Sequence, residues 1–185
     1  MDRLRVVLCS RNANKARELG ALGIELELLD ADGYPDEGED SYVENARAKA
    51  RYGRELGPAD AWMLGEDSGL EVVALGGGPG VRSARYGPEG AGAIERLLHE
   101  LQGVEDRRAR YVCELVLLGP DGEERRGSGV LKGRIAGEAR GSEGFGYDPV
   151  FLPGGEEHTV AELGNAWKAE NSHRARAAAD LRGRL

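Results

Sequence analysis

Short apolar runs alternate with helical segments along this chain, and that alternation limits the fold more than any other feature of the sequence. The apolar runs that predict strands are 4–9, 61–64, 72–75, 111–118 and 150–152, and two further strands are expected at 25–29, which alternates apolar and charged residues, and at the polar segment 124–131. Helical patterns cover a segment ending near Gly23 and the ranges 41–56, 88–101 and 172–185. Pro120-Asp121-Gly122 is a hairpin signal, so at least two strands are antiparallel. The sequence therefore predicts an α/β fold with a mixed sheet, in a single domain covering residues 1–185.

Net charge and hydropathy argue against two classes of binding partner, nucleic acids and membranes. The chain has 185 residues and a formal net charge of −8, without the basic footprint of a nucleic-acid-binding protein. It contains no apolar stretch long enough to span a membrane and no secretory signal pattern. We therefore expect a cytoplasmic protein with no nucleic-acid or membrane partner. A small anionic ligand held by a few local Lys and Arg side chains remains compatible with this charge.

Cysteine and glycine usage adds two constraints. Cys9 and Cys113 lie in apolar runs, which predicts small buried side chains rather than a disulfide. No Cys or His spacing predicts a zinc site. Glycine is abundant: the chain of 185 residues contains 29 glycines, more than double the usual share of about 7%. The glycines cluster at 76–78, 141–146 and 154–155, which is typical of loops that bring the backbone close to another group.

A polar segment separates the first apolar run from the helix that follows it. Its residues are Ser10, Arg11, Asn12, Ala13, Asn14 and Lys15. A helix N-terminus attracts anions, and side-chain donors together with the Lys15 ammonium can add to that attraction, so this segment can hold a polyphosphate. The alternative is a helix capped by Ser10 or Asn12 with an exposed lysine. The spacing is not that of a Walker A loop.

Two adjacent carboxylates, Glu66 and Asp67, follow the apolar run at 61–64, and Ser68 and Gly69 come next. Neighbours in a strand face opposite sides, so one carboxylate faces inward unless the chain bends here. A buried carboxylate must be paired or must hold a cation, and an oxygen-rich set without histidine suits Mg²⁺. Such a carboxylate can also orient or deprotonate a water molecule. The alternative is an acidic turn in solvent.

The helix predicted at 41–56 carries two further candidates. Glu44 belongs to a Ser41-x-x-Glu44 capping-box pattern, so a capping role stands beside a functional one. Lys49 lies five residues beyond Glu44 and should not pair with it on one helical face. Lys49 either points toward phosphates or is solvated.

Aromatic and basic residues near the C-terminus form the last group of candidates. Phe145 stands between Gly144 and Gly146, and an exposed ring in such a loop can stack on a nucleobase. Tyr147 and Asp148 follow it, and the alternative is that these aromatics only fill the core. Lys168, His173 and Arg174 occur at and before the start of the last helix, where cations oppose the helix dipole. Their placement favours a ligand acceptor there, such as a keto oxygen on a purine.

Several of these segments occur together in a fixed order. They are SRNANK (10–15), ENARAKA (44–50), EDSGLEV (66–72), GGPGVRSARYG (77–87), GFGYDPVF (144–151), AEL (161–163), Lys168 and SHR (172–174). In this order and at these intervals, from Leu4 to Arg176, the chain resembles the inosine triphosphate pyrophosphatase family. The chain has Glu66-Asp67 where the family often has two Asp, and Ser10-Arg11-Asn12 where it often has Thr-Gly-Asn.

The resemblance implies an elongated mixed sheet flanked by helices, two lobes with a central nucleotide cleft, a homodimer and dependence on Mg²⁺. It implies that Asp67 is the metal-linked general base, with Glu66 and Glu44 as further metal ligands. It implies that residues 10–15, Lys49 and Ser68 contact the phosphates, with Lys15 also catalytic. The base would stack on Phe145, with Gly146, Tyr147 and Asp148 in the same pocket. Lys168, His173 and Arg174 would read its 6-keto edge.

The resemblance also implies the reaction: hydrolysis of ITP, dITP or XTP to the nucleoside monophosphate and pyrophosphate. Two alternatives stay open. One is a house-cleaning pyrophosphatase of the Maf type, acting on modified or pyrimidine nucleotides. The other is a nucleotide-binding regulator without catalysis, although a pure binder gains little from a buried acid beside phosphates.

Overall fold

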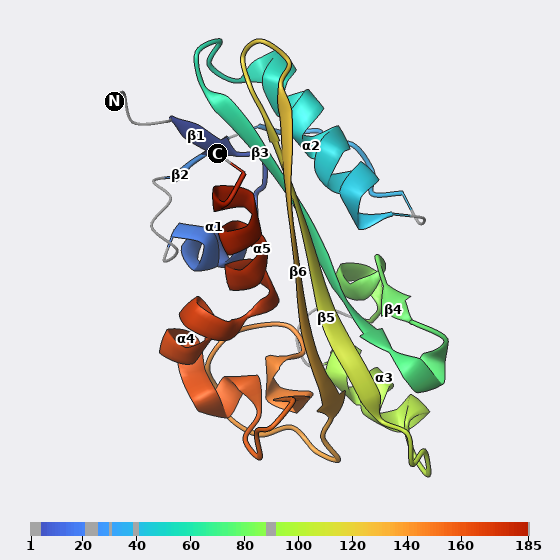
Figure 1. Cartoon of the computed structure of the whole chain (residues 1–185). Coiled ribbons are helices and arrows are strands. Elements are labelled where there is room, and N and C mark those ends of the chain that lie inside the picture. Colours follow the sequence, from blue (N-terminus) through green and yellow to red (C-terminus); the bar gives the residue numbers. More distant parts are fainter. Residues whose placement is uncertain (1–4, 21–25, 30, 39–40, 88–91, 185) are drawn as a thin grey trace. The chain divides into compact units, whose positions relative to one another are not determined.

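The computed structural model describes residues 5–20, 26–29, 31–38, 41–87 and 92–184 (Figure 1). Its strands are β1 (Val6–Leu8), β2 (Leu26–Leu28), β3 (Trp62–Val72), β4 (Pro79–Gly80), β5 (Arg108–Leu118), β6 (Glu124–Ile135) and β7 (Phe151–Pro153). Its helices are α1 (Ala13–Gly20), α2 (Tyr42–Leu56), α3 (Gly92–Glu100), α4 (Val160–Asn171) and α5 (His173–Arg182). Short 3₁₀ turns occupy Val73–Leu75, Ser83–Arg85 and Asp148–Val150.

The predicted mixed α/β fold is confirmed by the strand pairing. The seven strands lie in the order β2-β1-β3-β5-β6-β7, with β4 paired to β3. β1 is parallel to β2 and β3, whereas β4 is antiparallel to β3 and β7 is antiparallel to β6. The predicted hairpin joins β5 to β6, and the Gly119 amide donates to the Glu123 carbonyl at 2.8 Å. Gly122 has a φ of 88°, which explains why this turn needs a glycine.

The central strand differs from its prediction. The two apolar runs at 61–64 and 72–75 are not separate strands, because β3 runs without interruption through the acidic segment between them. Within this strand, Gly65 lets α2 approach closely, because a Cβ there would lie 1.8 Å from the Ala46 carbonyl oxygen of α2. Residues 73–75 form a 3₁₀ turn instead of a strand. The acidic pair therefore lies inside a strand rather than at its end.

Other predicted boundaries hold within a few residues, and one helix was not predicted. α4 begins with a capping box in which the Glu162 amide donates to the Thr159 hydroxyl and the Thr159 amide donates to the Glu162 carboxylate. This Thr-x-x-Glu pattern was present in the sequence as a helix-start signal. The predicted parts at Leu4, Gly23, Glu25, 88–91 and Leu185 lie outside the described residues.

The chain divides into two compact units. The first comprises the described residues within Met1–Ser68, Cys113–Gly129 and Arg174–Leu185. In this unit, α2 covers one face of the sheet, while α1 and α5 cover the other (Figure 1). Ala46 and Ala50 of α2 pack on Val116, and Leu19 and Leu181 pack with Leu64 on the opposite face. Helices therefore pack on both faces of the sheet in the first unit.

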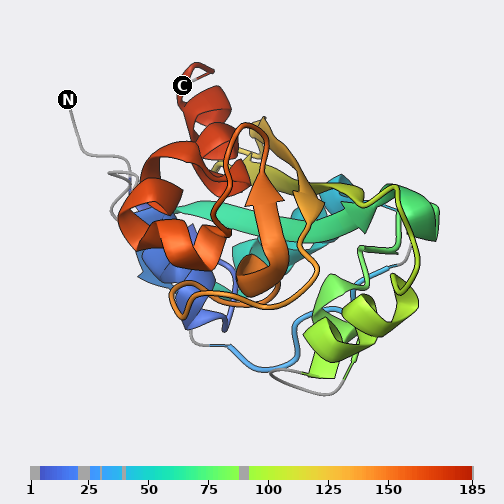
Figure 2. The same cartoon turned by 90° about the horizontal axis from the view of Figure 1, so that it is seen from below.

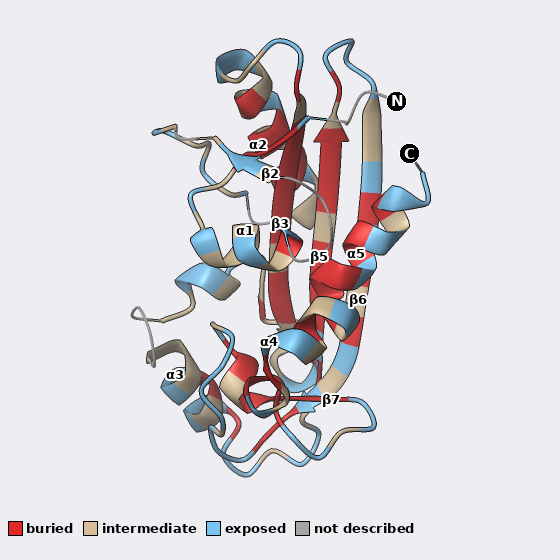
Figure 3. Cartoon of the chain, turned by 90° about the vertical axis from the view of Figure 1, so that its left-hand side faces the viewer, coloured by how far each residue is buried: buried red, intermediate tan, exposed pale blue. Residues whose placement is uncertain are grey.

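The second unit comprises the described residues within Gly69–Val112 and Val130–His173. Its core is one apolar cluster that includes Leu70, Leu97, Tyr111 and Phe151. α4 packs against β7 and the turn before it (Figure 2). β3 and β5, which run through both units, are buried along most of their length (Figure 3).

Two predictions made from composition can be compared with the fold. Cys9 and Cys113 are both buried free thiols, as predicted. None of the helices that the structure describes is long and apolar enough to cross a bilayer.

Candidate active site

Two neighbouring carboxylates of β3 form the centre of the candidate site in the first unit. Glu66 is 1% exposed and Asp67 is 2% exposed. Successive strand residues face opposite sides of a sheet, and in this unit helices cover both sides. The expectation that only one carboxylate faces inward was therefore wrong. Each carboxylate has its own set of partners.

Glu66 lies on the side covered by α1 and α5. Its Oε2 is 2.5 Å from the Lys15 ammonium, and its Oε1 accepts a hydrogen bond from Arg174 Nε at 3.1 Å. The Cys113 thiol lies 3.7 Å from the same Oε1. Burial alone would raise the pKa of the Glu66 carboxyl, but Lys15 and Arg174 outweigh it and hold the pKa below its ordinary value. Glu66 therefore remains ionised.

Arg174 extends this cluster. Its guanidinium, on a side chain only 5% exposed, donates to Glu18 Oε2 at 2.9 Å and to the Ser68 hydroxyl at 2.7 Å. The cluster thus contains two cations, Lys15 and Arg174, and two carboxylates, Glu18 and Glu66. Its formal charge is balanced without any ligand.

Asp67 lies on the side covered by α2. Its Oδ2 accepts from the Asn45 side-chain amide at 2.9 Å, and its Oδ1 lies 3.4 Å from the Lys49 ammonium. Burial raises the pKa of Asp67, and Lys49 and Asn45 only partly oppose that effect. A raised pKa makes this carboxylate a better proton acceptor than an ordinary aspartate, which favours a general base.

Lys49 occupies a position lined by oxygen atoms. Its ammonium is 2.5 Å from Glu37 Oε1, 3.1 Å from the Glu66 carbonyl oxygen and 3.4 Å from Asp67 Oδ1. Burial would lower the pKa of Lys49, but Asp67 and Glu37 outweigh it and raise the pKa. One cation here faces two carboxylates, Glu37 and Asp67. Lys49 is thus shared between the two carboxylates on this side of β3.

The oxygen set around Lys49 fits a hard divalent cation. Carboxylates and carbonyl oxygens are the ligands that Mg²⁺ takes, usually with water and substrate phosphates completing its shell. Within the described parts of the chain, no group of three His, Cys, Asp or Glu side chains is arranged to hold a metal ion. A metal at Asp67 would therefore depend on a ligand for part of its coordination.

Glu44 does not join Asp67. Its side chain is 64% exposed and pairs with Arg47, which in turn pairs with Glu124 at 2.8 Å. The Glu44 amide donates to the Ser41 hydroxyl at 3.4 Å, so the capping alternative is confirmed for Ser41. Lys49 does not pair with Glu44, as the helical spacing predicted. The metal-ligand prediction for Glu44 stays a prediction.

The segment 10–15 shows the capping alternative in detail. The Asn12 side-chain oxygen accepts from the Asn14 amide at 3.0 Å and from the Lys15 amide at 3.2 Å. The Ser10 hydroxyl accepts from the Asn12 amide at 3.1 Å. Arg11 is exposed and lies 3.4 Å from Asp32, and Ala13 is exposed at the first turn of α1. Lys15 alone of this segment reaches the acidic pair.

In the second unit, Asp148 organises the aromatic loop. Its Oδ2 accepts from the Phe145 amide at 2.9 Å and from the Lys168 ammonium at 2.6 Å, and its Oδ1 accepts from the Tyr111 hydroxyl at 3.2 Å. Gly144 has a φ of 79°, and a Cβ there would lie 2.2 Å from Asp148 Oδ2. Only glycine fits that position, so Asp148 fixes how the loop presents Phe145.

Three further predicted residues lie in the second unit near this loop. The Lys168 ammonium lies 4.7 Å from the centre of the Phe145 ring, which is half-buried. His173 is buried and stacks on Tyr111, with ring centres 4.6 Å apart. Tyr147 is buried, and its hydroxyl donates to the Ser83 carbonyl at 2.8 Å. Tyr147 thus anchors the loop to the core. Gly146 is exposed, with a φ of 62°.

Four residues with clear roles in this geometry were not singled out from the sequence: Glu18, Glu37, Asn45 and Tyr111. Asn45 follows Glu44 within a segment that carried the family resemblance, so its importance had a signal. Glu37 lay in an acidic, turn-rich stretch with nothing to distinguish it from its neighbours. Glu18 and Tyr111 are recognised only through their partners in the folded chain.

Comparison with known proteins adds independent information. A family model described as the Ham1 family matches residues 6–184. A protein of Opitutus terrae named dITP/XTP pyrophosphatase is 43% identical over 96% of this chain and 97% of its own length. One of the same name from Deinococcus radiodurans is 44% identical over 96% of this chain and 90% of its own length.

Solved structures agree with the sequence comparison. A Ham1 protein of Staphylococcus aureus superposes with a TM-score of 0.81 and 34% identity, covering 98% of this chain and 100% of its own. A HAM1 protein from Coxiella burnetii superposes with a TM-score of 0.82 and 35% identity, covering 98% of each chain.

Proposed function

Because this chain belongs to the Ham1 family, we propose that it is a pyrophosphatase acting on non-standard purine nucleoside triphosphates. Its substrates would be dITP, XTP and ITP, and its products the nucleoside monophosphate and pyrophosphate. The names of the curated relatives support this substrate class. The single observation that carries the proposal is Asp67: a buried carboxylate with a raised pKa beside a lysine and an oxygen-lined cation position.

In the proposed reaction, water attacks phosphorus and the linkage between the α- and β-phosphates breaks. Asp67 accepts the proton of that water, which its raised pKa favours. Lys15 and Lys49 lie near enough to the acidic pair to offset the negative charge that builds up on the phosphate oxygens. We propose that Ser68, which Arg174 holds by its hydroxyl, donates to a phosphate oxygen.

Mg²⁺ is the cofactor that we propose for this site. Asp67 and Glu37 are the residues best placed to hold it, because they already share one cation, Lys49. When bound, Mg²⁺ would neutralise phosphate charge and polarise the phosphorus–oxygen bonds. Glu66 already has two cationic partners and Glu44 is exposed, so we give both a smaller part than the resemblance implied.

For the nucleobase we propose the residues of the second unit. Phe145 would stack on the purine, and base stacking on an aromatic ring contributes about 1–3 kcal/mol. Lys168 and His173 would supply donors to a 6-keto oxygen, whereas the 6-amino group of adenine would leave those donors unpaired. Gly146 and Tyr147 complete the loop, and Asp148 holds it in place.

The remaining predicted residues have supporting parts in this proposal. Arg174, which the resemblance assigned to the base, is engaged with Glu18, Glu66 and Ser68, so we propose that it positions those groups. The turn at residues 10–14 would contact the phosphates through groups that its capping hydrogen bonds leave accessible. We also propose a homodimer that works in the cytoplasm, which sedimentation and cell fractionation would test.

The proposed function is tested by offering ITP, XTP, GTP, ATP and UTP with Mg²⁺ and identifying the released phosphate. Pyrophosphate released from ITP and XTP, with little from the other nucleotides, is the expected result. A preference for UTP would favour the Maf-type alternative. Orthophosphate as the first product would contradict the reaction. Binding of ITP without any turnover would favour a regulator.

A further inference from the structure

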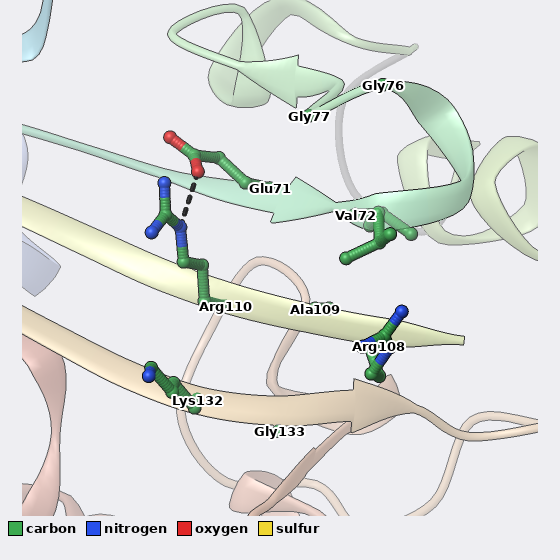
Figure 4. A pocket seen from close by; sticks show the side chains of 10 residues that line it. Glu71, Val72, Gly76, Gly77, Arg108, Ala109, Arg110, Lys132 and Gly133 are labelled. Carbon is green, nitrogen blue, oxygen red and sulfur yellow. Dashed lines mark hydrogen bonds and ion pairs between the residues drawn. The ribbon is translucent and has the colours of Figure 1, made fainter. Parts of the chain in front are cut away.

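A cavity of about 500 Å³ opens on the sheet of the second unit, and none of its lining residues belongs to the proposed reaction. Its walls come from β3, β5, β6 and the turn after β3 (Figure 4). Small-molecule sites usually measure about 300–1,000 Å³ and combine apolar walls with a few polar groups. The size of this cavity is therefore that of a small-molecule site.

Strand alternation gathers cations on one side of this cavity. Arg108 and Arg110 are two residues apart on β5, and Lys132 lies on the neighbouring β6. Ala109, between the two arginines, and Leu131, next to Lys132, pack into the core of this unit. Because successive strand residues alternate, the three cations project from the other face, and all three are exposed.

Three cations and one acidic residue line the cavity, although the chain carries a net charge of −8. Glu71 is the only acidic residue among its lining residues, and it holds Arg110 at 2.6 Å (Figure 4). Asp106 holds the Arg108 guanidinium at 2.6 Å. Lys132 forms no ion pair with any residue that the structure describes. Such a surface attracts anions, and an arginine held in a fixed orientation can donate two parallel hydrogen bonds to the oxygens of one phosphate.

The remaining wall is apolar and leaves space. Gly76 and Gly77 have φ angles of 62° and 92°, and a Cβ built on either would meet no atom within 4 Å. The Val73 side chain beside them is 53% exposed. This glycine cluster was prominent in the sequence, and the proposed reaction gives it no role.

We propose that this cavity is a second binding site, for a small molecule that bears a phosphate group. Arg108 and Lys132 hold the phosphate, and Glu71 keeps Arg110 directed toward it. The apolar part of the ligand lies against Val73 and the glycine turn. A nucleoside monophosphate is a ligand of this class that fits the volume.

The test is an NMR titration of the ¹⁵N-labelled full chain with AMP. The amide resonances of Gly76 and Gly77 report binding. AMP is chosen because its 6-amino group suits the proposed purine-binding residues poorly. Saturable shifts of these two amides are expected, and R108Q/K132Q should weaken AMP binding at least tenfold. The matched control is R126Q/R184Q, which removes two exposed positive charges in the first unit and should leave binding within twofold.

Companion titrations separate the phosphate from the rest of the ligand. Inorganic phosphate should displace AMP, and adenosine should leave both glycine amides unmoved. Shifts that grow linearly without saturation, or equal affinity in R108Q/K132Q, would overturn the proposal. So would adenosine binding as tightly as AMP, a single-stranded oligonucleotide binding more tightly than AMP, or the same shifts appearing as the protein concentration rises. The last result would assign this face to a second copy of the chain.

Discussion

Glu66 and Asp67 are adjacent in β3 and almost equally buried, yet their surroundings differ in charge. Glu66 shares a cluster with two cations and one other carboxylate, so the cluster is neutral. Asp67 shares one lysine with Glu37, so that one cation faces two carboxylates. The pKa of Glu66 is lowered and that of Asp67 is raised. The alternation of a strand thus gives one dipeptide two buried carboxylates in different charge environments.

The different pKa directions of these two buried carboxyl groups indicate which of them is suited to bind a proton or a metal ion. Burial disfavours the ionised form of both groups, and only at Glu66 do the nearby cations outweigh it. A carboxylate whose charge is already balanced by neighbouring cations gains little by binding a metal ion or a proton. An undercompensated acid gains by binding either one, and this supports the proposed function for Asp67.

The largest expected effect is on turnover. D67N removes the proposed base and should lower kcat by about 10²–10⁴-fold. Triphosphate binding should stay within about tenfold, or 1.4 kcal/mol. Steady-state kinetics and equilibrium binding of ITP measure the two quantities. D60N, which amidates an exposed aspartate of the same unit, is the control and should retain full activity. Normal turnover in D67N would reject the assignment.

The next effect is on stability, and substitution of only one of the two neighbours should lower the melting temperature. E66Q removes the buried carboxylate that pairs with Lys15 and Arg174. Removal of one partner of a buried ion pair lowers the free energy of unfolding by about 3–5 kcal/mol. At about 2–4 °C per kcal/mol, the melting temperature at pH 7 should fall by roughly 10 °C. D67N should not lower it, because the fold disfavours the ionised form of Asp67.

The pH dependence of these differences follows from linkage. The pKa of the Glu66 carboxyl is lower in the folded protein than in the unfolded chain. The ionised carboxylate therefore adds its full contribution to the free energy of unfolding when the pH is above the unfolded pKa. That contribution is lost as the pH falls toward the folded pKa. The gap in melting temperature between wild type and E66Q should therefore shrink below about pH 4. E27Q, which breaks an exposed pair with Arg5, should leave the melting temperature unchanged. A gap that widens in acid would contradict the sign.

A smaller effect should appear in the pH profile. Glu37 is a like charge that raises the pKa of Asp67, so E37Q should lower that pKa. The acid limb of kcat/KM, measured at saturating Mg²⁺, should move to lower pH by less than about one unit. E37Q should also need more Mg²⁺ for half-maximal rate. D36N, the exposed neighbour, should change neither quantity. A shift of the acid limb to higher pH would contradict the proposed coupling.

Much of this arrangement was predictable from sequence, and the limits have physical causes. The mixed sheet, the hairpin at Pro120-Asp121-Gly122 and the two buried cysteines follow from local patterns. The acidic pair was identified, but not its position inside a continuous strand, because Gly65 marks a close approach of α2 and not the end of the strand.

The partners of the candidate site were harder to predict than the site itself. Arg174 and Glu66 are separated by 108 positions, and their contact depends on how α5 packs in the first unit. No local pattern distinguishes Glu37, which reaches Lys49 from an irregular segment. Charge balance is a property of the folded cluster, so the sequence named both carboxylates without separating their roles.

The most direct test of these contrasting environments is a ¹³C NMR titration of the side-chain carboxyl groups, with E66Q and D67N used to assign the two signals. Asp67 should titrate above 3.8, the ordinary value for an aspartate, and Glu66 below 4.5, the ordinary value for a glutamate. Asp67 titrating below 3.8 while Glu66 titrates above 4.5 would contradict the division of roles between them.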